Sequence, residues 1–292
     1  MYELNQVSGN CFYIQSPAKI GLIKLNEQDV CLIDSGNDKE AGKKVRQILE
    51  NNNWNLKAIY NTHSNADHIG GNKYLQAQTG CKIYAPIIES AFTKSPVLEP
   101  SFLYGGFPFS ELKHKFLMAQ ESEVEVLTKD VLPESMSKID LKGHFFNMVG
   151  FEHSDGVIYL ADCLSSKNIL DKYKITFIYD VQSYLETLEK VKQMDAKIFI
   201  PSHSDAADNI KELAQYNIDT VNEIIHLIIN LLQAPMTFEK LLKSLFDYYK
   251  LQMSPEQFVL VGSTIRSYLS YLKDSGKIGF TFIANEMTWS AL

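Results

Sequence analysis

Residues 61–71, NTHSNADHIGG, concentrate side chains that bind transition metals. His63, Asp67 and His68 offer two imidazoles and one carboxylate within six residues, and zinc and iron accept both kinds of donor. Asn65 lies between them and offers only a neutral amide oxygen, which these metals prefer less than an imidazole nitrogen. The segment therefore predicts a metal site in which one position has lost a nitrogen donor.

Three more candidate ligands follow, each near the end of an expected strand. His144 comes after a strand and a glycine, Asp162 ends the apolar run IYLAD, and His203 ends IFIPSH. A buried carboxylate without a partner is costly, so Asp162 after an apolar strand indicates a site that uses its charge. Because side chains at the carboxyl ends of strands can meet at one edge of a sheet, we expect all three to converge on residues 63–68.

The apolar pattern predicts strands in the first two-thirds of the chain and helices after them. Strands are expected at residues 10–16, 19–26, 29–36, 56–63, 81–86, 123–128, 137–144 and 196–203. Residues 148–162 are expected to form two strands joined by a hairpin turn at Asp155-Gly156, with His153 as a turn residue rather than a ligand. From about residue 208 the pattern changes to three helices and a β-hairpin, with Thr237 and Ser254 placed to cap two of the helices. We therefore divide the chain into a metal-binding domain, residues 1–208, and a smaller module, residues 209–292.

Residues 95–120 interrupt the strand pattern with prolines, two adjacent glycines and several aromatic side chains. The segment is too apolar for a disordered linker. It is either an ordered surface excursion or a lid in which Tyr104 and Phe107 help to wall a substrate pocket.

The composition argues against several classes of protein. A net charge of −7 disfavours a protein that binds nucleic-acid phosphates strongly. The four cysteines lie far apart without a C-x-x-C pair, which indicates buried, reduced thiols. No apolar run reaches the roughly 18 residues of a membrane span, and no signal-peptide pattern is visible, so we expect a cytoplasmic protein.

Taken in order, the metal-binding motifs resemble those of the metallo-β-lactamase-fold hydrolase superfamily. THSNADH matches the family's T-H-x-H-x-D-H motif except at Asn65, and GH, LAD and PSH match its later motifs. The intervals also fit, with 76 residues from His68 to His144, 18 more to Asp162 and 41 more to His203. The resemblance covers residues 1–208. It implies an α+β fold, a four-layer αββα sandwich, with two metals at one edge.

The resemblance also implies a role for each candidate ligand. One metal would be held by His63, His144 and position 65, the other by Asp67, His68 and His203, and Asp162 would bridge them. Asp34 would lie behind the ligands, and Asp67 would also carry a proton to the leaving group. We expect zinc, one ion bound tightly and a second weakly because of Asn65, although this ligand mix also serves iron and manganese. A bound divalent ion would lower the pKa of water to roughly 7, so that the water could attack a carbonyl or phosphoryl centre.

The C-terminal residues resemble in layout the small winged-helix-like domain that some superfamily members carry, including thioesterase-like and endoribonuclease-like ones. Residues 216–292 contain six Lys and Arg against seven acidic residues, which weakens the case for nucleic-acid contact. We expect this module to pack on the main domain or on a second subunit, as in a homo-oligomer.

Three functions remain open. The leading interpretation is a metal-dependent hydrolase of a small ester, thioester or lactone, with a small-molecule substrate and no membrane partner. A nuclease of the same superfamily is the second. A non-catalytic protein that senses a metal or ligand is the third.

Overall fold

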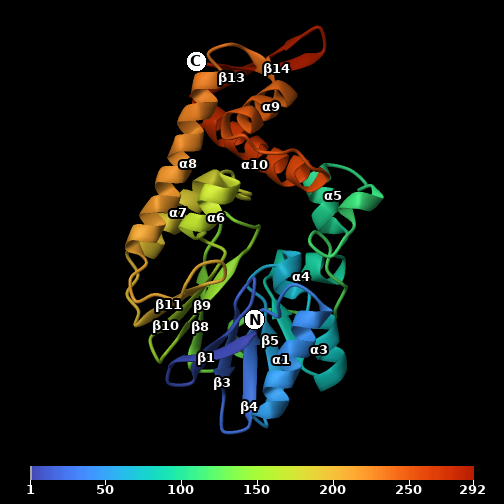
Figure 1. Cartoon of the computed structure of the whole chain (residues 1–292), viewed down its shortest axis with the longest axis vertical. Coiled ribbons are helices and arrows are strands. Elements are labelled where there is room, and N and C mark those ends of the chain that lie inside the picture. Colours follow the sequence, from blue (N-terminus) through green and yellow to red (C-terminus); the bar gives the residue numbers. More distant parts are fainter. Residues whose placement is uncertain (1) are drawn as a thin grey trace.

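The computed structural model describes residues 2–292, and its two large β-sheets pack face to face between helices (Figure 1). The first sheet has seven strands in chain order: β1 (Glu3–Ser8), β2 (Cys11–Gln15), β3 (Ile20–Lys24), β4 (Asp29–Ile33), β5 (Asn55–Tyr60), β6 (Lys82–Ala85) and β7 (Glu125–Val126). The second has the order β11 (Ile198–Pro201), β10 (Val157–Ala161), β9 (Val149–His153) and β8 (Met136–Asp140). The predicted strands are present with small shifts at their ends.

Alternating side chains along the strands of the first sheet build two apolar layers. Leu22 and Leu32 pack against the helices α1 (Lys39–Asn51) and α3 (Asn72–Thr79). Their neighbours Ile23, Cys31 and Ile33 point to the opposite face and meet the second sheet. One face of this sheet therefore carries helices and the other face carries the second sheet.

The outer face of the second sheet completes the sandwich. Leu160 of β10 and Phe199 of β11 lie in one apolar cluster with α7 (Val181–Lys192) and α8 (Lys211–Leu231). The order of layers is thus helix, sheet, sheet, helix, as the resemblance implied.

The C-terminal module continues this outer layer. After α8 it contains β12 (Met236–Thr237), α9 (Phe238–Tyr249), α10 (Pro255–Asp274), β13 (Ile278–Ile283) and β14 (Glu286–Ala291), with the three strands in the order β12-β14-β13. Thr237 and Ser254 cap α9 and α10 by accepting bonds from Lys240 and Gln257, as predicted. The sequence did not predict the short strand β12.

The module and the sandwich share one core. Leu241 of α9 and Ile265 of α10 belong to the same buried cluster as Leu188 of α7 and Phe145 of the β8–β9 loop. In Figure 1, α8 runs along the left side from the sandwich up to the module. The predicted boundary between residues 208 and 209 therefore falls just before a helix that packs against both parts.

The excursion at residues 95–120 is ordered. It contains α5 (Leu98–Tyr104) and the short helix η1 (Ser110–Leu112), and it follows α4 (Ile87–Lys94). Leu103 and Leu112 bury themselves against Val259 of α10, so the excursion is fixed to the module. The remaining short helices are α2 (Ala66–Ile69), η2 (Lys129–Val131) and α6 (Lys167–Tyr173).

All four cysteines are free and buried, as predicted. Burial raises the pKa of Cys11 to about 12 and also raises the pKa of the other three thiols. Across residues 2–292 no helix combines the length and the apolar character needed to cross a membrane.

Candidate metal centre

The carboxyl ends of four strands bring the candidate ligands to one edge of the sandwich. His63 follows β5, Asp162 follows β10 directly and His203 follows β11. Within each sheet the relevant strands, β4 with β5 and β10 with β11, are parallel, so their carboxyl ends lie at the same edge. The short helix α2 carries Asp67 and His68, and the loop between β8 and β9 carries His144.

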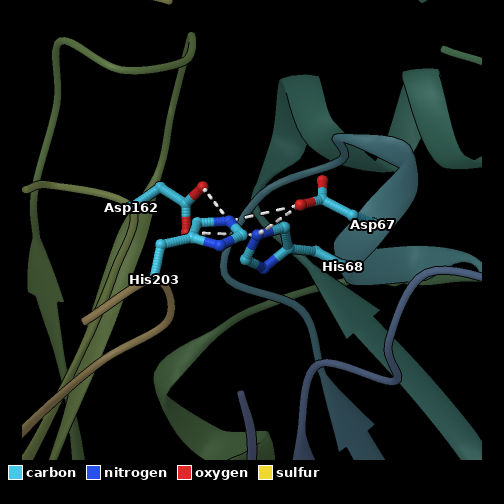
Figure 2. A group of neighbouring side chains, drawn as sticks. All are labelled: Asp67, His68, Asp162 and His203. Carbon is cyan, nitrogen blue, oxygen red and sulfur yellow. Dashed lines mark ion pairs between the residues drawn. The ribbon is translucent and has the colours of Figure 1, made fainter. Parts of the chain in front are cut away.

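Four side chains form the first of two ligand groups. Figure 2 shows Asp67 and His68 from one side meeting Asp162 and His203 from the other. Nε2 of His203 lies 3.2 Å from Oδ2 of Asp67 and 3.1 Å from Oδ2 of Asp162. Nε2 of His68 lies 3.1 Å from Oδ1 of Asp162. The four donor atoms lie within 4.8 Å of one another, a spacing that one metal ion can bridge.

The second group consists of His63, His144 and Asp162, again with donor atoms within 4.8 Å of one another. Nε2 of His144 lies 3.8 Å from Oδ2 of Asp162 and 3.1 Å from Oδ1 of Asn65. Asp162 thus belongs to both groups, and Asn65 faces the second group, at the position where the family motif has a histidine.

The outer ring nitrogens of His63 and His68 are held by one carboxylate. Nδ1 of His68 donates to Oδ2 of Asp34 over 2.8 Å. The hydroxyl of Thr62 also donates to Asp34, over 2.7 Å, so its oxygen is left to accept from Nδ1 of His63 at 3.0 Å. Asp34 therefore lies behind the ligands and fixes both imidazoles with Nε2 turned inward.

Backbone carbonyls hold the other two histidines. Nδ1 of His144 donates to the carbonyl of Phe177 and Nδ1 of His203 donates to the carbonyl of Pro17, each over 3.1 Å. A carbonyl only accepts, so the proton sits on Nδ1 and the lone pair of Nε2 faces the centre. In their neutral form all four histidines thus present an unprotonated Nε2 to the same space.

This arrangement leaves acceptors facing acceptors. Nε2 of His63, Nε2 of His68 and Oδ1 of Asp162 are buried without a hydrogen-bond partner. Buried acceptors in native proteins normally have partners, and lone pairs that face one another without a proton repel. A cation between them removes the conflict, so the residues present fit a divalent metal such as zinc, iron or manganese.

The electrostatics of the metal-free centre agree with that conclusion. Burial would raise the pKa of Asp162, but the positive charges of His203 and His68 hold it well below its usual value. Burial alone would lower the pKa of His203, but the carboxylates of Asp162 and Asp67 outweigh burial and raise this pKa to about 10. Without metal, His68 and His203 take up a second proton, on Nε2, and neutralise the carboxylates. A bound divalent ion supplies the same positive charge.

At His63 and His144 the pKa is lowered instead of raised. Burial and the nearby His68 lower the pKa of His63 well below its usual value. Burial also lowers the pKa of His144. These two rings therefore stay neutral and keep their lone pairs, which is the form that binds a metal.

A third cluster with suitable donor types has a different character. Cys11, His153 and Asp155 also bring donor atoms within 4.8 Å. However, the Asn10 amide donates to Oδ2 of Asp155, and the Asp155 amide donates to Nδ1 of His153. These acceptors already have partners, and His153 serves the turn after β9, as its sequence predicted.

Two buried glutamates that the sequence analysis missed support the ligand loops. Oε2 of Glu89 accepts from the Ser64 amide at 3.1 Å and from the Ser64 hydroxyl at 2.6 Å, and Oε1 accepts from the Asn147 amide at 2.7 Å. Glu99 of α5 bonds Asn65. Each glutamate stands almost alone among apolar neighbours, in IIESAF and VLEPSF, and that contrast is the signal that could have revealed them.

The position of His144 depends on the glycine before it. Gly143 has φ +118°, and a Cβ atom there would lie 2.3 Å from backbone atoms of Tyr184 in α7. Only glycine allows the β8–β9 loop to approach α7 so closely.

The predicted pocket residues have different surroundings. Tyr104 lines a cavity of about 970 Å³ between α5, the start of α7 and α10, together with Tyr179 and Arg266. The cavity lining contains none of the candidate ligands. Phe107 does not line it: the side chain is 80% exposed, with the Lys113 ammonium 4.8 Å from its ring centre. The left-handed Gly105, φ +78°, ends α5 and turns the chain outward before Phe107.

A family model described as the Metallo-beta-lactamase superfamily matches residues 6–203. The chain belongs to this superfamily. Its members are generally hydrolases, and the fold implies a divalent metal, which the His and Asp cluster fits. Asn65 is the departure from the superfamily's metal motif noted above.

Solved structures extend the likeness beyond the matched residues. A beta-lactamase domain protein from Burkholderia ambifaria is 14% identical with a TM-score of 0.76, over 99% of this chain and 94% of that chain. A metallo-beta-lactamase family protein from Thermus thermophilus is 16% identical with a TM-score of 0.71, over 94% of each chain. A metallo-beta-lactamase from Pontibacter korlensis is 16% identical with a TM-score of 0.57, over 76% of this chain and 99% of that one. At these identities the likeness concerns the fold alone.

One curated relative matches over a short stretch. The hydroxyacylglutathione hydrolase of Maricaulis maris (strain MCS10) is 52% identical over 33 residues, which span 11% of this chain and 13% of that relative.

Proposed function

We propose that the chain is a metal-dependent hydrolase of a small ester, thioester or lactone. The observation that carries the proposal is the set of four histidine Nε2 lone pairs that face the same space as the carboxylates of Asp67 and Asp162. The short match to a hydroxyacylglutathione hydrolase is consistent with the thioester branch.

The chain's own residues have separable tasks in this proposal. When bound, the divalent ions supply Lewis-acid activation of water and of the substrate oxygen. Asp67 has the most exposed carboxylate of the cluster, at 35%, against 9% for Asp162. It therefore faces the side from which substrate arrives and is suited to carry a proton to the leaving group. Asp162 stays buried and holds charge between the two positions.

We propose that the two metal positions differ in strength. The position at Asp67, His68, Asp162 and His203 has two imidazoles and two carboxylates, and should hold zinc tightly. The position at His63 and His144 has Asn65 where the motif has a third imidazole, and should bind more weakly. Iron or manganese would also suit these donors.

Metal analysis tests this inequality. We expect about one ion per chain after purification and close to two after restoring the imidazole with Asn65→His. Two equally tight ions in the unmodified protein would contradict the proposal.

Substrate assays test the reaction class. We expect a thioester or lactone to turn over, and chelation followed by zinc addition to abolish and then restore turnover. Turnover of a phosphodiester or of structured RNA alone would favour the nuclease of this superfamily. A protein that binds metal but converts none of these substrates would favour the sensor.

The remaining proposals concern the whole chain. We propose that residues 209–292 form a winged-helix-like domain, supported by the order helix, strand, two helices, two strands. Its near balance of charges supports a small-molecule substrate rather than a nucleic acid or a membrane as partner. It could also mediate a homo-oligomer. Four free thiols are typical of a reducing compartment and support a cytoplasmic location.

A further inference from the structure

The amide of Asn65 is held from two sides. Its Nδ2 donates to Oε1 of Glu99 over 2.7 Å, and its Oδ1 faces Nε2 of His144 at 3.1 Å. Glu99 lies on the first turn of α5 and is only 4% exposed. The sequence motif contains Asn65 but gives no hint of Glu99, which lies 34 residues away.

The partners determine which end of the amide faces the metal position. Burial raises the pKa of Glu99 well above its ordinary value, and the bond from Asn65 opposes that rise. Above that pKa Glu99 is a carboxylate, which only accepts, so it selects the NH₂ group of Asn65 and leaves the oxygen to point at His144. His144 cannot donate to that oxygen, because its proton is on Nδ1 and bonds the Phe177 carbonyl. Two acceptors therefore face each other at 3.1 Å with no hydrogen between them.

The opposite orientation would close the position. If the amide turned over, its NH₂ group could donate to Nε2 of His144 and satisfy that lone pair. The oxygen would then face the carboxylate of Glu99, which repels it. Glu99 thus keeps Asn65 in the orientation that is unfavourable without a cation and favourable with one.

We propose that Glu99 is a positioning residue, which turns the amide oxygen of Asn65 toward the metal position at His63 and His144 and makes it a ligand there. The inference rests on the metal centre of the proposed function. The donor set is then two imidazole nitrogens with oxygens from Asn65 and Asp162. Compared with the three-imidazole motif, this set shifts the preference from zinc toward harder ions such as Mn²⁺.

The experiment is a double-substitution cycle read by metal binding rather than by turnover. Metal-free parent, Glu99→Gln, Asn65→Ala and the double variant are titrated with Mn²⁺ to millimolar concentration, and free Mn²⁺ is followed by its EPR signal. The variants His144→Ala and His203→Ala identify which binding phase belongs to which position. Thermal unfolding of each variant checks that it is folded.

We expect Glu99→Gln to weaken the His144-dependent phase by about tenfold or more, because glutamine can either donate or accept and no longer selects one amide orientation. The His203-dependent phase should be unchanged. In the Asn65→Ala background Glu99→Gln should have no further effect, since the amide through which it acts is gone.

Three results would overturn the inference. The first is a Glu99→Gln protein that binds the His144-dependent ion as tightly as the parent. The second is an equal effect of Glu99→Gln with and without Asn65, which would mean that Glu99 acts through its charge alone. The third is a parent that binds no second ion at millimolar Mn²⁺. If the four proteins bind Mn²⁺ as expected but convert no substrate, the hydrolase proposal would be overturned and the role of Glu99 would remain.

Discussion

Asp162 is the one candidate ligand that belongs to both donor groups, so its removal should differ in kind from that of any histidine. We expect Asp162→Asn to weaken both ions by more than the roughly 10–100-fold that changes behind the ligands cost. His203→Ala should weaken one ion and His144→Ala the other. Calorimetric titration of the metal-free proteins with Zn²⁺ measures this. A normal ion at either position in Asp162→Asn would contradict the shared role.

Glu89 should make the stability of the metal-free protein depend on pH. Burial raises the pKa of Glu89 to about 7, above its ordinary value. The folded protein then holds the proton more tightly than the unfolded chain, so the stabilisation is full below the ordinary pKa and is lost as the pH rises through 7. Between pH 6 and pH 9 this loss should reach roughly 1.4 kcal/mol.

Urea unfolding at several pH values, with chelator present, tests this expectation. Glu89→Gln cannot ionise at this position and should therefore lose less stability than the parent as the pH rises from 6 to 9. The exposed Glu134→Gln is the matched control and should follow the parent. A parent and a Glu89→Gln protein with parallel pH profiles would show that Glu89 is not the titrating group.

Residue types and spacing were enough to predict that six imidazoles and carboxylates meet at one edge of the sandwich, because such side chains after strands are rare without a purpose. The family resemblance added Asp34 behind them. The carbonyls of Phe177 and Pro17 could not be predicted. Every residue has a carbonyl, and only the fold decides which ones meet a histidine.

At the scale of elements, the β8–β9 loop connects the metal centre to α7 through Gly143. Gly143→Ala should destabilise the protein by at least about 2 kcal/mol, since alanine adds a positive-φ penalty and a clash with Tyr184. It should also weaken the ion at His144, the next residue. Gly80 is a suitable control, because it has φ +68° with nothing near its Cβ position.

The comparison separates backbone strain from the clash. Gly80→Ala should cost about 1–2 kcal/mol in urea unfolding and leave metal binding unchanged. Equal losses of unfolding free energy in Gly143→Ala and Gly80→Ala, with metal binding intact in both, would mean that the close approach to α7 does not position His144.

Most elements were predictable because their apolar residues recur with clear periods, and the caps at Thr237 and Ser254 were readable from residue type. The excursion at 95–120 was harder. Its order comes from Leu103 and Leu112 packing on Val259, more than 140 residues later in the chain. Such a contact leaves no local pattern.

At the scale of the whole molecule, the sandwich and the C-terminal module should unfold together. Ile228 of α8 is fully buried in the cluster that joins them. Ile228→Ala should lower the unfolding free energy by about 2–5 kcal/mol and keep a single transition.

The two tryptophans allow a direct measurement. Trp54 packs beside the first sheet and Trp289 lies in β14 of the module. Trp54→Phe and Trp289→Phe leave one fluorescent reporter at each end of the molecule. Unfolding curves from the two reporters should coincide in the parent and in Ile228→Ala. Separate midpoints would mean that the shared core does not couple the two parts.

The buried cysteines allow the rate at which the native protein opens to be measured without an added label. Only a thiolate attacks a disulfide reagent, and here each thiol is both buried and held in its protonated form, so the reagent should react only as fast as molecules open. Cys163 follows Asp162 directly in the chain, whereas Cys81 precedes β6 and is buried in the cluster between the first sheet and its helices. The labelling rates of these two cysteines, with and without metal, would therefore show how much the bound ion slows local opening of the sandwich edge that holds the candidate ligands.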